Sequence, residues 1–265
     1  MGADAESAAP MGVGAESAAP MGVVAESAGP TLDELRRRMA AIPGRGESRS
    51  AAAPSERESG RAVLSTPLAI AELLPEGGLR KGDVVEYTGA SSLLAGLVAA
   101  VTASGGHAAL VGVPGLGLLA AAEMGARLER LAVVADPGPD PVEVAAVLLD
   151  GLDLIVLGLG GAAVPPARCR VIAARARAKG ATLVVTDGRW THPSLRLEAD
   201  IAGYGGLGAG SGRLRSVALA VAVRDRAGPP RRGRIELRPT AGRIEWVRSR
   251  DSATGAAEAA DVAAC

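Results

Sequence analysis

The sequence is short of the residues that most often carry chemistry or fill an aromatic core. Its 265 residues include no Phe, two Trp, two Tyr, two His and two Cys. The two thiols, Cys169 and Cys265, stand outside any CxxC pair, so neither a zinc site nor a disulfide framework is expected. A core must therefore be built from Ala, Val, Leu and Ile, which suits strands buried between helices.

An excess of charge and long apolar runs are also missing. Lys and Arg together number 29, as do Asp and Glu, so the net charge of +0 gives no global attraction to nucleic acid. No window approaches the ~20 apolar residues of a membrane-spanning helix. The first thirty residues lack the basic and apolar regions of a signal peptide. We therefore expect a cytoplasmic protein with no membrane partner.

Three copies of a decamer, each ending in Pro, make up residues 1–30: MGADAESAAP, MGVGAESAAP and MGVVAESAGP. Units so rich in small residues bury too little apolar surface to offset ordering entropy, so a disordered tail is predicted; the alternative is a repeated docking motif. Residues 31–44 predict an amphipathic helix with Leu35 and Met39 on its apolar face, and residues 45–60 a polar linker. The helix either packs on the chain's own core or docks on a partner.

Residues 61–250 show the alternation of an α/β fold. Short apolar runs predict strands at 83–88, 107–113, 131–135, 152–157 and 181–186, with helices at 93–103, 118–128, 141–150 and 168–179 between them. This pattern indicates a mainly parallel sheet between helices. Beyond it we predict a flexible glycine loop at 203–212, then antiparallel strands at 213–224, 234–239 and 243–248, and a loose tail at 251–265.

The segment GASSLLAG (89–96) stands between a strand and a helix, where a phosphate-binding loop GxxxxGK[ST] would lie. Gly89 keeps the first glycine and Ser92 lies within the segment. Leu94 replaces the second glycine, Ala95 the Lys and Gly96 the Ser or Thr. That Lys neutralises phosphate and that hydroxyl holds Mg²⁺, so we expect no nucleotide chemistry here.

The wider sequence resembles RecA-type recombinases over roughly residues 61–240. GGLRKGDVVEYTGASS (77–92) is similar to the lead-in to the RecA P-loop, and LDLIVLG (152–158) to the strand with the Mg²⁺-coordinating Asp. SGRLRSVALAVAVRDR (211–226) resembles the second DNA-binding loop and its following strand. The resemblance implies a RecA-like P-loop core in which Pro114 stands at the catalytic Glu and Gly158 at the metal-binding Asp. It implies a degenerate nucleotide site with no catalytic residue, metal or cofactor, formed by Gly89, Ser92, Ala95, Gly96, Pro114 and Gly158.

A RecA-like core without nucleotide residues, in an Ala/Gly/Arg-biased chain, is similar to the ImuA-type mutasome accessory proteins of actinobacteria. The resemblance implies a non-enzymatic role in the SOS response to DNA damage, in translesion synthesis and mutagenesis. The implied partner is ImuB, a catalytically inactive Y-family polymerase homologue that recruits an error-prone C-family polymerase. The alternatives are a DNA-binding RecA paralogue that regulates recombination, and an ATPase with an unusual loop.

Residues 213–250 hold eleven Arg against three acidic residues. Arg binds phosphate in bidentate fashion, which indicates a surface that faces DNA or a partner; the alternative is solvated strand edges kept apart by charge. The candidate DNA contacts are Arg213, Arg215 and Arg224. The candidate partner contacts are Leu35, Met39, Arg231, Arg232, Arg234 and Trp246.

Overall fold

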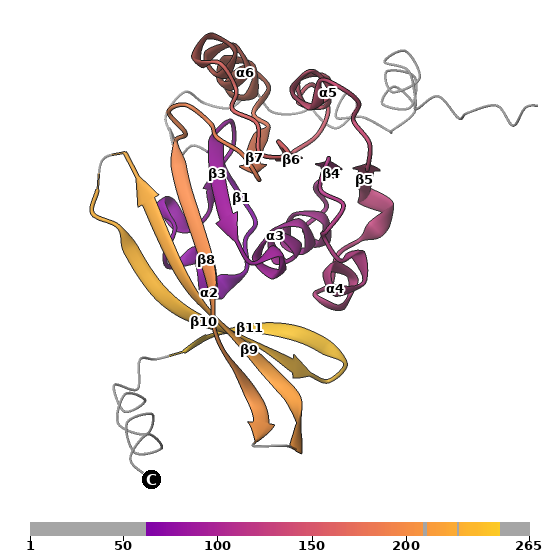
Figure 1. Ribbon diagram of the computed structural model, residues 1–265, viewed down its shortest axis with the longest axis vertical. Helices are drawn as coiled ribbons and strands as arrows, with labels where there is room; N and C mark the ends of the chain where they lie inside the picture. The colour runs from indigo at the N-terminus through magenta and orange to yellow at the C-terminus, as the bar shows by residue number, and fades with distance from the viewer. Residues whose placement is uncertain (1–61, 209–210, 227, 250–265) are drawn as a thin grey trace, which may run out of the picture.

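The computed structural model describes residues 62–208, 211–226 and 228–249. The predictions for the decamer repeats, the helix at 31–44 with Leu35 and Met39, the linker at 45–60 and the tail at 251–265 lie outside these residues. The described residues form an α/β fold around one large mixed sheet (Figure 1).

Five strands form a parallel series in which each is followed by a connection that contains a helix or a turn. They are β3 (Val84–Gly89), β4 (Ala108–Val111), β5 (Leu131–Val134), β6 (Leu154–Gly158) and β7 (Thr182–Thr186). The connecting helices are α3 (Ser91–Ala103), α4 (Leu118–Glu123), α5 (Pro141–Leu148) and α6 (Pro166–Lys179), with the 3-10 turn η2 (Leu128–Arg130) before β5.

The chain then continues as a series of long strands. They are β8 (Leu195–Gly208), which runs parallel to β3, followed by the antiparallel β9 (Ser211–Asp225), β10 (Arg231–Thr240) and β11 (Arg243–Ser249). Across the sheet the order is β11-β10-β9-β8-β3-β7-β6-β4-β5. Ahead of β3 lie β1 (Val63–Leu64), α2 (Leu68–Ala71), the 3-10 turn η1 (Pro75–Gly77) and β2 (Leu79–Arg80), with β1 and β2 paired as a small second sheet.

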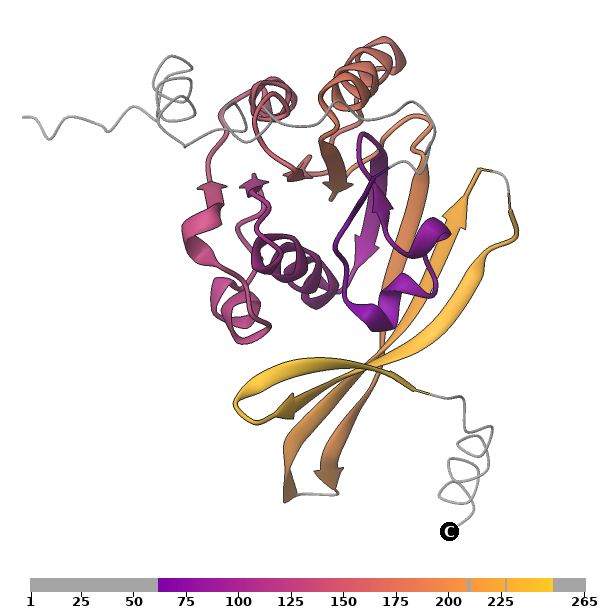
Figure 2. The same cartoon turned by 180° about the vertical axis from the view of Figure 1, so that it is seen from behind.

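The parallel strands are apolar throughout because both of their faces are buried. On β6, Leu154 and Val156 join the cluster that contains α3, whereas Ile155 and Leu157 join the cluster that contains α5 and α6. Figures 1 and 2 show α3 and α4 on one face of this part of the sheet and α5 and α6 on the other. Helix α5 starts where Asp140 accepts a hydrogen bond from the Glu143 amide at 3.1 Å, and α6 ends at Gly180 in the left-handed conformation.

The predicted series of strands and helices is confirmed to within a few residues, and so are the antiparallel strands near the C-terminal end. The flexible glycine loop at 203–212 is wrong, because β8 extends to Gly208 and β9 begins at Ser211. Glycine is required at these positions because β9 lies too close to leave room for a Cβ atom. A Cβ at Gly205 would lie 2.3 Å from the Ser216 hydroxyl, and one at Gly206 2.4 Å from the Arg213 carbonyl, where the β8–β9 register shifts.

Candidate functional site

The degenerate loop is closed by the neighbouring strand. Gly89 ends β3 with a φ of 111°, and a Cβ there would lie 2.0 Å from the carbonyl oxygen of Ala199 on β8. The same carbonyl accepts a hydrogen bond from the Ala90 amide at 2.7 Å. In a phosphate-binding loop such amides point at the ligand, but here the Ala90 amide is already bonded within the sheet.

Helix α3 begins at Ser91, so Ala90 alone connects it to β3. This start lies two residues before the predicted one and leaves no loop of several residues to wrap a phosphate. Ala95 and Leu94 are buried in α3, and Leu93 and Leu97 pack in the main core cluster. Ser92 is half-buried in the first turn. These residue types make α3 part of the apolar core at the point where the motif would place its charged and polar groups.

A second contact covers α3 from the far edge of the sheet. A Cβ at Gly96 would lie 2.2 Å from Cζ2 of Trp246, so the indole from β11 rests directly on the helix backbone. Trp246 is half-buried and packs against the core cluster. The structure thus places this predicted partner contact on the chain's own α3, at the position where the motif would carry Ser or Thr.

Tyr87 of β3 stabilises the connection between β3 and α3. Its side chain is buried, and its hydroxyl donates a hydrogen bond to the Ala90 carbonyl. Burial, with a smaller contribution from the charge of Asp200, raises the pKa of Tyr87 above its usual value. The hydroxyl is therefore held neutral as a donor that fixes Ala90.

The remaining positions of the predicted site follow β4 and β6, at the same edge of the sheet as Gly89. Pro114 is exposed in the turn after β4. Gly158 is buried at the end of β6, and a Cβ there would lie 2.2 Å from the Gly112 carbonyl oxygen. The backbones approach so closely that no carboxylate fits at position 158. Among the described residues no group of three or more His, Cys, Asp or Glu could hold a metal ion.

The three predicted DNA contacts form two separate groups along β9. Arg213 and Arg215 are exposed at one end of β9, and Arg224 lies near the other end, nine or more residues away, so the three predicted DNA contacts do not form one site. At ~3.3 Å per residue the two groups are about 30 Å apart. No side-chain partner of Arg213 or Arg215 is found among the described residues.

Arg224 instead shares with three other arginines a face of the sheet that no described helix covers at this point. It lies directly opposite Arg196 on β8, and Arg232 and Arg234 pair with Ala222 and Ala220 of β9 on the same face. All four are exposed. Arg196 was not predicted as a site residue, because it lies outside the arginine-rich segment. We call Arg196, Arg224, Arg232 and Arg234 the arginine face.

Like charges that lie opposite one another repel, and acidic neighbours offset this here. Glu86 of β3 accepts a bond from Arg196 Nε at 2.7 Å, and Glu198 lies 3.8 Å from Arg224. Other arginines are bound within the fold: Arg231 donates to the Leu74 carbonyl at 3.2 Å, and Arg248 pairs with Glu72 of α2. Within the described residues, Arg196 and Arg224 of the arginine face therefore have acidic neighbours, whereas no ion pair is found for Arg232 or Arg234.

The described part of the chain contains no helix with the length and apolar character to cross a membrane.

Comparison with known proteins places the chain in a family. A family model described as the MT3502 N-terminal domain matches residues 72–192, which include β3 to β7 and all six positions of the degenerate site but end before β8. The chain is also similar to the Uncharacterized protein Rv3395c of Mycobacterium tuberculosis. The two are 53% identical over 175 residues, which cover 65% of this chain and 78% of that protein. The chain therefore belongs to the family of Rv3395c.

Proposed function

We propose that this chain is a non-catalytic adaptor with a RecA-like core that acts in damage-induced translesion DNA synthesis. In this role it binds an ImuB-type inactive Y-family polymerase homologue and, through that protein, supports an error-prone C-family polymerase. The single observation that supports the non-catalytic part most strongly is the packing of the degenerate loop. The Ala199 carbonyl lies against Gly89, and the Trp246 indole lies against Gly96.

These contacts go beyond the loss of the motif's Lys and Ser or Thr. An electrostatic catalytic group typically contributes ~10²–10³ in rate, so its loss alone can leave weak activity. Here the space beside the helix start is filled by backbone and side-chain atoms, which also opposes binding. In this proposal the fold serves as a scaffold, and the protein acts by binding partners through its surface.

The arginine face supports the binding part of the proposal. On that side of the sheet the described helices α5 and α6 cover β6 and β7, and no described helix lies over β8, β9 and β10 (Figure 1). Arg is enriched at the energetically important centres of protein interfaces. We therefore place polymerase-homologue binding on this face.

A pair of matched double variants tests this assignment. We expect Arg232→Ala with Arg234→Ala to weaken binding of the purified ImuB-type partner by about tenfold or more, as measured by calorimetry. Arg213→Ala with Arg215→Ala removes the same number of charges from β9 and leaves that affinity within about threefold. Equal effects of the two double variants, or no binding by the unaltered chain, would refute the assignment.

The second candidate function is a DNA-binding regulator of recombination. It is favoured by Arg213 and Arg215, which are exposed and have no side-chain partner among the described residues. Under this alternative the chain binds single-stranded DNA with an affinity that falls steeply with salt, and the Arg213/Arg215 variant lowers that salt dependence. The adaptor proposal predicts no measurable shift of a single-stranded oligonucleotide even at low salt.

A further inference from the structure

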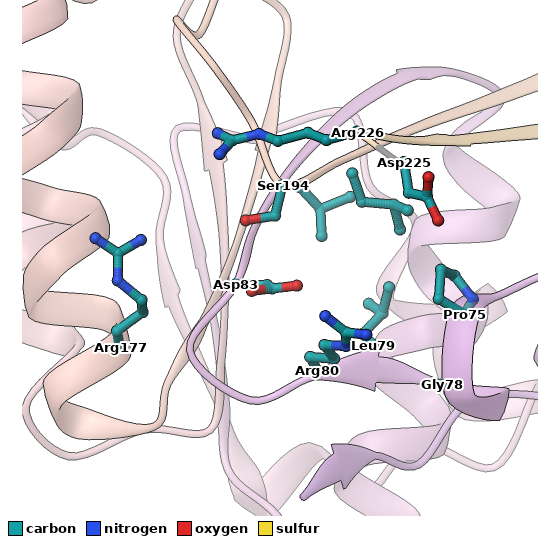
Figure 3. A pocket seen from close by; sticks show the side chains of 11 residues that line it. Pro75, Gly78, Leu79, Arg80, Asp83, Arg177, Ser194, Asp225 and Arg226 are labelled. Atoms are coloured by element: carbon teal, nitrogen blue, oxygen red, sulfur yellow. The ribbon is translucent and has the colours of Figure 1, made fainter. Parts of the chain in front are cut away.

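A cavity of about 310 Å³ lies before the start of β3, between the last turn of α6 and the end of β9. Figure 3 shows charged side chains of both signs around it. Several of them are engaged within the fold, since Arg80 is paired with Glu76, and Arg226 donates to the carbonyls of His192 and Pro193. The bonds of Arg226 hold the start of β8 beside the end of β9, which is where the arginine face begins.

The positive charge of the arginine face is least balanced on β10. The arginines of this face on β8 and β9 have carboxylate neighbours, whereas no ion pair is found for Arg232 or Arg234 in the part of the chain that the structure describes. Both side chains are exposed. The next carboxylate along this face of β10, Glu236, is already bound by Arg238. Two neighbouring guanidinium groups without a carboxylate partner favour the binding of an anionic segment.

The surface beside these two arginines is made of small residues. The positions opposite them on β9 are alanines, Ala222 and Ala220. The guanidinium of Arg234 extends across β9 toward β8, because a Cβ at Gly203 would lie 3.6 Å from its Nη2 atom. With no bulky side chain in the way, a segment that lies close to the sheet can contact both guanidinium groups.

The chain leaves the described structure beside this part of the face. Ser249, the last residue of β11, pairs with Arg234 of β10. If the antiparallel register continued for two more residues, Asp251 would lie opposite Arg232, and opposite charges attract at such paired positions. Residues 251–265 contain three carboxylate side chains and no Lys or Arg, and most of their other residues are alanine. The segment therefore matches the face in charge and in side-chain size.

We propose that residues 251–265 bind to the arginine face of their own chain, with Asp251 against Arg232. The carboxylates of Glu258 and Asp261 then bind the arginines further across the sheet. The segment is long enough, because β11 and β8 are three strand spacings apart, about 14 Å, whereas its residues span about 50 Å when extended. A segment tethered so closely has an effective concentration of about 1 mM, so even weak ion pairs keep it bound for much of the time.

The same contact gives the arginine face a built-in competitor. A partner that binds this face must first displace residues 251–265, which lowers its apparent affinity. This consequence rests on the proposed function, because it assumes that the polymerase homologue binds the arginine face. The contact itself does not depend on that assumption and is tested without any partner.

Disulfide trapping in the full chain tests the contact. Residues 251–265 carry one thiol, Cys265, and the other natural thiol, Cys169, is buried. After Ala220→Cys, treatment with diamide should join position 220 to Cys265 within one chain, seen as a monomer of altered mobility on a non-reducing gel. We expect this reaction to be about fivefold faster than in a matched Leu119→Cys chain. Position 119 is exposed on α4, on the other face of the sheet (Figure 1).

Neutralising the segment tests the role of its charge. Glu258→Gln with Asp261→Asn, or about 0.5 M NaCl, should slow trapping at position 220 about threefold, because each weakens the ion pairs. The same double variant should bind the ImuB-type partner about two- to fivefold more tightly, since the competitor is weakened. Equal trapping at positions 220 and 119, or trapping that ignores charge and salt, would overturn the contact. A partner affinity that does not rise would overturn the competition, whereas an unaltered chain that binds no partner would refute the adaptor proposal alone.

Discussion

The indole of Trp246 lies on Gly96 so closely that a methyl group at position 96 would be 2.2 Å from Cζ2. This contact joins the last described strand, β11, to the first helix after β3, about 150 residues earlier in the chain. It fixes the C-terminal hairpin over the start of α3. It also makes a glycine necessary inside a helix, where glycine is otherwise unfavourable.

The contact predicts that Gly96→Ala destabilises the fold. In an open helix the same change stabilises by about 0.5–1 kcal/mol, whereas here the added methyl group overlaps the indole and should cost about 1–3 kcal/mol. The measurement is the free energy of unfolding in urea. Combining Gly96→Ala with Trp246→Leu should recover most of the loss. A control is Gly115→Ala in the turn after β4, where a Cβ meets nothing within 4 Å. Stabilisation by Gly96→Ala alone would contradict the contact.

Restoring the missing motif residues should not restore nucleotide binding. We expect a chain with Ala95→Lys and Gly96→Ser to show no binding of a fluorescent ATP analogue with Mg²⁺ at millimolar concentration. The reason is that Ala90 alone connects β3 to α3, and its amide is bonded to Ala199. The unaltered chain serves as the control. ATP hydrolysis by the double variant would mean that the loop can open, against the closed packing described above.

The raised pKa of Tyr87 predicts that the free energy of unfolding falls at alkaline pH. Its folded-state pKa is raised above the usual value of 10.0 by burial, followed by the charge of Asp200. Below about pH 10 the hydroxyl is neutral in both states and the free energy of unfolding is unaffected. As the pH rises above that value the unfolded chain ionises first, so this contribution to stability is lost.

Tyr87→Phe tests both the hydrogen bond and the pKa. At pH 7 the variant should lose about 0.5–1.5 kcal/mol, because the Ala90 carbonyl loses its donor. Above pH 10 the difference from the unaltered chain should shrink, because Phe does not ionise. Urea unfolding at pH 8 and near pH 11 measures this, with Tyr204→Phe as an exposed control. A difference that stays constant with pH would contradict the raised pKa.

The ion pair between Glu86 and Arg196 predicts a contribution to the free energy of unfolding that depends on salt concentration. Glu86→Gln leaves Arg196 without its 2.7 Å carboxylate partner, opposite Arg224. Because Arg196 is largely exposed, the loss of unfolding free energy should be modest, about 1 kcal/mol at low ionic strength. It should decrease in 0.5 M NaCl as the repulsion between the arginines is screened. Glu198→Gln, whose contact with Arg224 is 3.8 Å, should change stability by less than about 0.5 kcal/mol. A larger loss at high salt would contradict this interpretation.

The parts of the fold that could be predicted depend on the local sequence. The parts that could not depend on contacts between residues far apart in the chain. Strands such as β6 were predictable because burial on both faces imposes a continuous apolar run. The end of β8 was missed because its glycines resemble a loop, although cross-strand contacts such as that between Gly205 and Ser216 require them. The short elements β1 and β2 have two residues each, too few for a periodic pattern.

The candidate site likewise combines features that local motifs predict with features that depend on long-range contacts. The lost Lys, Ser or Thr, and Asp could be predicted from local motifs, but the closure of the loop by Ala199 and Trp246 depends on strands that follow more than 100 residues later. The cavity before β3 was also missed, because its lining residues Asp83, Arg177, Ser194 and Arg226 come from four separate parts of the chain. No local pattern predicts that they meet.

Affinity purification of the full chain from DNA-damaged cells, followed by mass spectrometry, tests the adaptor proposal most directly. We predict that an ImuB-type Y-family polymerase homologue is recovered together with an error-prone C-family polymerase. Its recovery should be unchanged when ATP and Mg²⁺ are removed with apyrase and EDTA, and reduced by Arg232→Ala with Arg234→Ala. Recovery of no polymerase subunit, or recovery that requires ATP, would contradict the account.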